Sequence, residues 1–183
     1  MPSCGKPIIV RRSRLCTEDE ARALDVCTRL GVTHDRLDAT RRALSSQFGR
    51  LAGAGDAVWR ILHEVLAEGR DWQRRRIVYF QMARFLWEDG KDCLQASREA
   101  TRMQLEDWKA SADAGLLDLG RARLVVITSR QASCPTCRAL DGATFTYQQA
   151  QESMPIPVSQ CSNEKSPDRL RGWCRCTYGL LPK

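Results

Sequence analysis

The sequence Cys134-Pro135-Thr136-Cys137, followed by Cys161 and then by Cys174-Arg175-Cys176, contains five of the nine cysteines of this 183-residue chain. The two residues between Cys134 and Cys137 let both sulfur atoms reach one ion from a tight turn, which is the spacing of a metal knuckle. A structural zinc site takes four such ligands in a tetrahedron. The pattern therefore predicts one closed, structural Zn²⁺ site near the C-terminus.

Five cysteines compete for four positions in this site. On an extended strand Cys174 and Cys176 point to the same face and lie about 6.5 Å apart, so both can ligate only if the backbone curls. The predicted ligands are Cys134, Cys137, Cys161 and Cys174, with Cys176 as the substitute or as a buried free thiol. Two alternatives stay open: the cysteines are core residues, or Cys134 and Cys137 form a redox pair. A redox C-x-x-C normally opens a helix in a βαβ unit, whereas here the chain leads into a turn.

The composition is typical of a folded protein with reduced cysteines. Hydrophobic residues make up 43% of the chain and include five Trp, enough for a core. The sequence has no apolar run of about 18 residues, so no membrane span is expected. The N-terminal residues lack the apolar region of a signal peptide, and an odd cysteine count argues against a complete disulfide framework. We therefore expect a cytoplasmic protein.

Helical periodicity dominates the N-terminal part of the chain. Residues 1–16 are predicted to form an irregular basic arm, and residues 17–115 a helical domain. Capping residues and apolar stripes predict five helices, at about 17–30, 35–51, 56–68, 72–89 and 92–114. The fourth is apolar in almost every direction, so we expect it to be buried all round.

The pattern changes to strands in residues 121–183. Leu124 to Thr128 is a β-branched apolar run, and Asp141-Gly142 is a turn signal before a second strand at 143–147. A short helix at about 148–154 and a third strand at about 173–181 follow. The predicted fold class is α+β: an N-terminal helical bundle followed by a small, zinc-stapled antiparallel β module.

No catalytic constellation stands out. The two histidines, His34 and His63, lack the spacing of a metalloprotease or of a zinc deaminase. No nucleophile-elbow, Walker or dinucleotide motif is present, and no small-molecule substrate is indicated. An enzyme or toxin with an unrecognised site is therefore an alternative without support from a motif.

Basic residues near the cysteines indicate a second alternative, a zinc-ribbon-like nucleic-acid-binding protein. The formal net charge is +7, and arginines interleaved with an aromatic residue could bind phosphate and stack bases. The candidates are Arg138, Arg169, Arg171, Trp173 and Arg175. The simpler interpretation is that charge keeps the surface of a small module soluble.

The order of motifs resembles a known family. Cys134-Pro-Thr-Cys137 with Leu140-Asp141-Gly142 and Phe145, then Pro155-Ile156-Pro157, then Cys174-Arg-Cys176, is similar to the C-terminal module of phage minor head (head-morphogenesis) proteins of the Mu F-like class. The match covers about the last 60 residues. Two features depart from the family pattern: Cys161 takes the place of a histidine, and about a dozen polar residues separate Cys161 from Cys174.

This resemblance implies a non-enzymatic, zinc-stabilised module for protein–protein interaction or assembly. We expect a protein partner or self-association, with nucleic acid as the alternative partner and no membrane.

Overall fold

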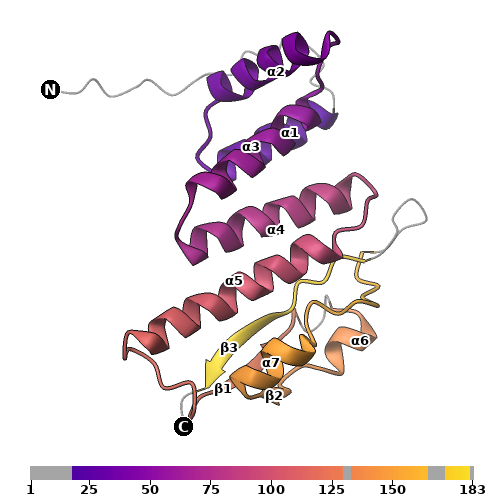
Figure 1. The fold of residues 1–183 in the computed structure, drawn as a ribbon. Helices are drawn as coiled ribbons and strands as arrows, with labels where there is room; N and C mark the ends of the chain where they lie inside the picture. The colour runs from indigo at the N-terminus through magenta and orange to yellow at the C-terminus, as the bar shows by residue number, and fades with distance from the viewer. Residues whose placement is uncertain (1–17, 130–132, 165–171, 182–183) are drawn as a thin grey trace, which may run out of the picture. The chain divides into compact units, whose positions relative to one another are not determined.

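We describe the chain from a computed structural model, which covers residues 18–129, 133–164 and 172–181 (Figure 1). The predicted basic arm at 1–16 and Thr17, with which the first predicted helix begins, lie outside the described residues. The chain divides into two compact units, Met1–Val58 and Trp59–Lys183. The second unit contains α4 and α5, which the sequence analysis assigns to the helical domain, together with the sheet.

The five predicted helices are confirmed. Their bounds are α1 Glu18–Arg29, α2 His34–Phe48, α3 Ala54–Glu68, α4 Trp72–Glu88 and α5 Leu94–Asp113. Two of them begin at capping side chains: Thr33 accepts a hydrogen bond from the Arg36 amide, and Asp71 accepts from Gln73 and Arg74. Such caps satisfy amides that have no partner within the helix, which fixes where each helix begins.

The first unit is built on the apolar stripes of α1 and α2. Ala23, Val26 and Cys27 on α1 are buried, as are Leu37 and Leu44 on α2. Burial raises the pKa of the Cys27 thiol, against the opposing charge of Arg36. Cys27 is therefore a small core residue of this unit.

Helices α4 and α5 lie side by side in the second unit (Figure 1). One face of α4 is buried, including Val78, Met82 and Phe85. The expectation that α4 is buried all round is wrong, because Ile77 and Phe80 remain 49% and 40% exposed. Helix α4 has more apolar residues than the elements packed against it bury, so some of these side chains remain exposed.

The C-terminal part forms a three-stranded antiparallel sheet in the order β2-β1-β3. The strands are β1 Arg123–Ile127, β2 Thr144–Phe145 and β3 Thr177–Leu181, with the short helices α6 Pro135–Arg138 and α7 Tyr147–Ser153 beside them. The fold class is α+β, as predicted. Helix α6 is additional, since a tight turn was expected at its residues.

The register assigns the side chains of the sheet to two faces. Leu124 pairs with Leu180 and Phe145, and Val126 pairs with Tyr178, so these residues share one face. That face belongs to the core that also holds Leu105 of α5 and the cysteine cluster. The opposite face carries Val125, Ile127, Gly179 and Leu181. Ile127 and Leu181 on this outer face are 48% and 45% exposed.

None of the helices in the described part of the chain is both long enough and apolar enough to cross a membrane.

Candidate metal centre

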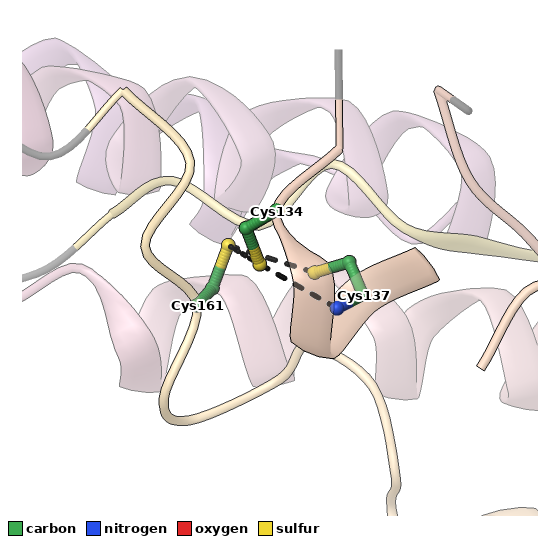
Figure 2. A group of neighbouring side chains, drawn as sticks. All are labelled: Cys134, Cys137 and Cys161. Carbon is green, nitrogen blue, oxygen red and sulfur yellow. Dashed lines mark hydrogen bonds between the residues drawn. The ribbon is translucent and has the colours of Figure 1, made fainter. Parts of the chain in front are cut away.

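Helix α6 positions the first two cysteines. Cys134 is its N-cap, and the Cys134 sulfur accepts a hydrogen bond from the backbone amide of Cys137 at 3.4 Å (Figure 2). Pro135 occupies the first helical position, where a missing amide hydrogen costs nothing. The single helical turn therefore presents the Cys134 and Cys137 sulfurs on the same side.

The Leu-Asp-Gly turn holds this helix against the sheet. Asp141 accepts two hydrogen bonds from Thr128, one from its amide at 3.0 Å and one from its hydroxyl at 2.9 Å. The Gly142 amide donates to the carbonyl oxygen of Val126 at 2.9 Å, and Gly142 has a φ of +76°, which favours glycine. Asp141 is thus more than a turn residue, because it ties down the chain at the end of β1.

A close backbone crossing brings Cys161 to the last two cysteines. The Gly172 amide donates to the Cys161 carbonyl at 2.9 Å, and the Trp173 amide donates to the Asn163 carbonyl at 2.9 Å. A Cβ atom at Gly172 would lie 2.5–2.6 Å from three backbone atoms of Cys161 and Asn163. Only glycine allows this approach, which places Cys174 beside Cys161.

The sulfur atoms of these segments converge. Those of Cys134 and Cys161 are 3.8 Å apart, those of Cys137 and Cys161 3.6 Å, and those of Cys137 and Cys174 3.8 Å. Figure 2 shows Cys134, Cys137 and Cys161 pointing toward one another. The sulfurs form two groups within 4.8 Å, Cys134-Cys137-Cys161 and Cys137-Cys174-Cys176, which share Cys137. This five-cysteine cluster could hold a metal ion.

The cluster is buried and contains no disulfide. Every cysteine in the described part of the chain is a free thiol, and the four residues Cys134, Cys137, Cys161 and Cys174 are buried. Their exposed fractions range from 2% to 9%. Cys176 is the member of the cluster that is partly exposed. Burial of the four ligands is typical of a structural site, in which protein side chains fill all four positions on the ion.

The electrostatics of the metal-free cluster are uneven. Burial acts to raise the pKa of Cys134, but amides of Cys137 and Ser162 and neighbouring thiols lower it to about 6. Hydrogen bonds from the Cys161 and Cys176 thiols lower the pKa of Cys174 to about 2.

The other three thiols hold their protons. Burial, followed by the charge of Cys174, raises the pKa of Cys137 to about 12. Donation to Cys174 is the main cause that raises the pKa values of Cys161 and Cys176. Negative charge therefore collects on two sulfurs, and a metal ion would displace the protons of the others.

A polar chain supports the last strand from α4 and α5. Arg76 of α4 donates to the Thr177 hydroxyl at 3.0 Å, the Thr177 hydroxyl donates to Oε1 of Gln104 at 3.2 Å, and Gln104 donates from Nε2 to the Tyr178 carbonyl at 2.9 Å. Burial lowers the pKa of Arg76, with Asp107 opposing. The sequence analysis missed these residues, since Arg76 and Thr177 are 101 positions apart and neither belongs to a motif.

The aromatic residue among the predicted nucleic-acid residues, Trp173, is packed inside the protein. Trp173 is 7% exposed and packs against Phe80 and Trp87, with ring centroids 5.2 and 5.4 Å away. The Arg175 guanidinium lies 4.9 Å from the centre of the Trp173 ring and pairs with Glu164. Arg138 is exposed at the end of α6. Arg169 and Arg171 lie outside the described residues. The Trp173 ring is thus occupied by the protein's own aromatic residues.

No protein-family model, curated protein or solved structure matches this chain.

Proposed function

We propose that the chain binds one Zn²⁺ through Cys134, Cys137, Cys161 and Cys174 and that the metal is structural. The observation that carries this proposal is the spacing of the sulfurs. A tetrahedral zinc ion with Zn–S bonds of about 2.3 Å separates its sulfur ligands by about 3.8 Å. Three of the six separations among these four sulfurs are 3.6, 3.8 and 3.8 Å, which match this spacing.

The chemistry of the donors favours zinc over calcium and magnesium. Thiolates are soft ligands that select zinc, copper(I) or iron–sulfur clusters, whereas calcium and magnesium prefer oxygen. The amides of Cys137 and Val158 donate to the sulfurs of Cys134 and Cys174 at 3.4 and 3.2 Å. Such bonds stabilise the negative charge that four thiolates leave around one divalent ion.

The role of the ion would be to supply folding energy. It would join α6, the segment at Cys161 and the entry to β3, which are far apart in sequence. The strands have only five, two and five residues, and a sheet of this size buries little apolar surface of its own. Zinc bound to four thiolates can contribute about 10 kcal/mol or more to folding.

For the function of the module we propose protein–protein assembly of the phage head-morphogenesis type. Two observations support it. The ordered motifs of the last 60 residues resemble that family, and the outer face of the sheet exposes apolar side chains. Gly179 lies on the same face, and a Cβ atom there would lie 2.7 Å from Cδ1 of Ile127. The absence of a side chain at Gly179 therefore leaves room for the Ile127 side chain. Exposed apolar residues on one face of a sheet are suited to contact with another protein.

Metal analysis of protein purified without added metal tests the zinc site. We expect one zinc per chain, and its loss when Cys134, Cys137 or Cys161 is replaced by Ser. Cys93→Ser is the matched control, because Cys93 is a buried cysteine outside the cluster. Wild-type protein without metal would contradict the proposed site.

Sedimentation of the zinc-loaded chain tests assembly. We expect association that strengthens with protein concentration and weakens in Ile127→Glu, while zinc content stays unchanged. Leu51→Glu is the control, because Leu51 is an exposed apolar residue outside the sheet. A chain that remains monomeric at high concentration would exclude self-association and leave a different protein as the required partner.

A further inference from the structure

Cys176 differs from the other four cysteines of the cluster in its access to solvent. The four proposed ligands are buried, whereas Cys176 is partly exposed. A pocket of about 70 Å³ has both Cys174 and Cys176 in its wall, together with Arg76, Gln104, Arg175 and Thr177. Cys134, Cys137 and Cys161 are not part of this wall. Small molecules in the pocket can therefore reach the cluster on the Cys174–Cys176 side.

The sulfur of Cys176 also lies near a proposed zinc ligand. The sulfurs of Cys137, Cys174 and Cys176 are all within 4.8 Å of one another. A disulfide requires sulfurs about 2 Å apart, so the Cys174 and Cys176 sulfurs would have to approach each other from within 4.8 Å to form one. A zinc tetrahedron uses four of the five thiols, and the fifth is left at the pocket as an available reductant.

We propose that Cys176 is an oxidation site at which a hydroperoxide converts Cys174 and Cys176 into a disulfide and releases the zinc ion. This inference rests on the proposed zinc site and adds a regulated function to it. The substrate class is a small peroxide, with hydrogen peroxide as the simplest member.

The chemistry balances in two steps. The Cys176 sulfur attacks one peroxide oxygen while its thiol proton passes to the departing oxygen, the O–O bond breaks, and the products are Cys176 sulfenic acid and water. The Cys174 thiolate then leaves the zinc ion and attacks the Cys176 sulfur, which forms the S–S bond and expels hydroxide. The two sulfurs lose two electrons in all, the peroxide gains them, and a proton converts the hydroxide to water.

The pocket suits this reagent. Its volume of about 70 Å³ exceeds the roughly 10–15 Å³ that one water molecule requires, so a small peroxide fits. Arg76 donates one hydrogen bond to Thr177, and a guanidinium carries five N–H donors. The remaining donors can bind the peroxide oxygens and the departing hydroxide. Gln104 and Thr177 hold each other at 3.2 Å and keep this wall in place.

Loss of Cys174 from the ion would open the site. Three cysteines would remain, and water would take the fourth position, which is the arrangement of a labile or catalytic zinc rather than a structural one. Because the ion joins the segment at Cys161 to the entry of β3, its release would loosen the same part of the fold. Reduction of the disulfide in the presence of zinc would reverse the change.

The test is zinc release from the full-length, zinc-loaded chain after addition of hydrogen peroxide, followed with a chromophoric zinc chelator. We expect Cys176→Ser to keep one zinc per chain and to release it about tenfold more slowly than wild type, since the accessible thiol is gone. Cys93→Ser should release zinc at the wild-type rate. Peptide mass spectrometry should find the Cys174–Cys176 disulfide in oxidised wild type, and dithiothreitol with zinc should restore binding.

The outcomes separate this inference from the zinc site itself. Wild type without zinc contradicts the proposed function. If Cys176→Ser binds no zinc, Cys176 is a ligand and the inference is overturned while the metal site stands. Release from Cys176→Ser at the wild-type rate, or a disulfide between Cys134 and Cys137 instead, would also overturn it. Arg76→Gln gives a second readout, because a functional pocket requires slower release in this variant with zinc content unchanged.

Discussion

The backbone of Gly172 crosses that of Cys161 so closely that the Gly172 amide donates to the Cys161 carbonyl at 2.9 Å and no side chain fits between them. This contact joins two segments of the cysteine cluster before any metal is considered. It also explains how a polar stretch between Cys161 and Cys174 can be tolerated, because the chain returns to the same point at its end.

Gly172→Ala should therefore damage the site. Its Cβ would meet three backbone atoms at 2.5–2.6 Å, and backbone cannot move aside as a flexible side chain can. We expect a loss of about 1–3 kcal/mol in the free energy of unfolding and weaker zinc binding, measured by urea unfolding and chelator competition. Gly53→Ala is the control, because the nearest atom to its Cβ would be 3.8 Å away. Equal stability of the two variants would contradict the steric argument.

Gln104→Ala should destabilise the second unit without touching a cysteine. Gln104 is 7% exposed and joins α5 to β3 through the Tyr178 carbonyl and the Thr177 hydroxyl. Its removal leaves buried polar groups without this partner, which costs about 1–3 kcal/mol. Urea unfolding should show this loss, whereas Gln95→Ala, an exposed position on the same helix, should change stability by less than about 0.5 kcal/mol.

The sequence predicts the elements of this fold better than their contacts. Periodicity and caps locate all five long helices, because helix formation depends on neighbours three and four residues apart. The helical turn at Cys134 was missed, since a C-x-x-C spacing fits a tight turn and a short helix equally well. The cysteine spacing predicts that the sulfurs belong together.

Long-range contacts are what sequence reasoning could not supply. Nothing local indicates that Arg76 reaches Thr177, that Gln104 supports β3, or that Trp173 is covered by Phe80 and Trp87. Each of these contacts forms through tertiary packing, and none of the residues that make it belongs to a sequence motif. The same limit applies to Gly172. Its sequence context indicates only a polar loop, whereas in the structure its backbone lies directly against the backbone of Cys161 and Asn163.

Tyr178 gives a pH-dependent test of core packing. It is 2% exposed, and burial raises its pKa to about 12, with the Ile156 backbone opposing in part. The pKa of this phenol is higher in the folded chain than in the unfolded chain, so its contribution to stability is fully present below the unfolded pKa of about 10. The contribution is lost as the pH rises through the folded pKa of about 12. The stability difference between wild type and Tyr178→Phe should therefore shift against wild type from pH 10 to 12, by about 1.4 kcal/mol per unit of pKa.

Absorbance of tyrosinate provides the direct measurement. The chain has three tyrosines, and one equivalent should titrate near pH 12 in the wild type and be missing from Tyr178→Phe. Tyr79→Phe, at a partly exposed position on α4, should retain that equivalent. If the two variants lose the same part of the titration curve, Tyr178 is not protected as its burial implies.

The choice between Cys174 and Cys176 as fourth ligand can be settled by a double-substitution experiment. The Cys174 sulfur is 3.8 Å from that of Cys137 and accepts the Val158 amide at 3.2 Å, whereas Cys176 lies within 4.8 Å of Cys137 and is partly exposed. We expect Cys174→Ser to bind zinc through Cys176 with an affinity lower by at least about tenfold, or 1.4 kcal/mol.

Cys176→Ser should bind zinc with the wild-type affinity. The double variant should lose more binding free energy than the two single variants together, because it alone has no fourth thiolate. Competition with a chromophoric chelator measures all three affinities. Additive effects would mean that Cys176 does not substitute for Cys174, and a greater loss in Cys176→Ser than in Cys174→Ser would reverse the assignment.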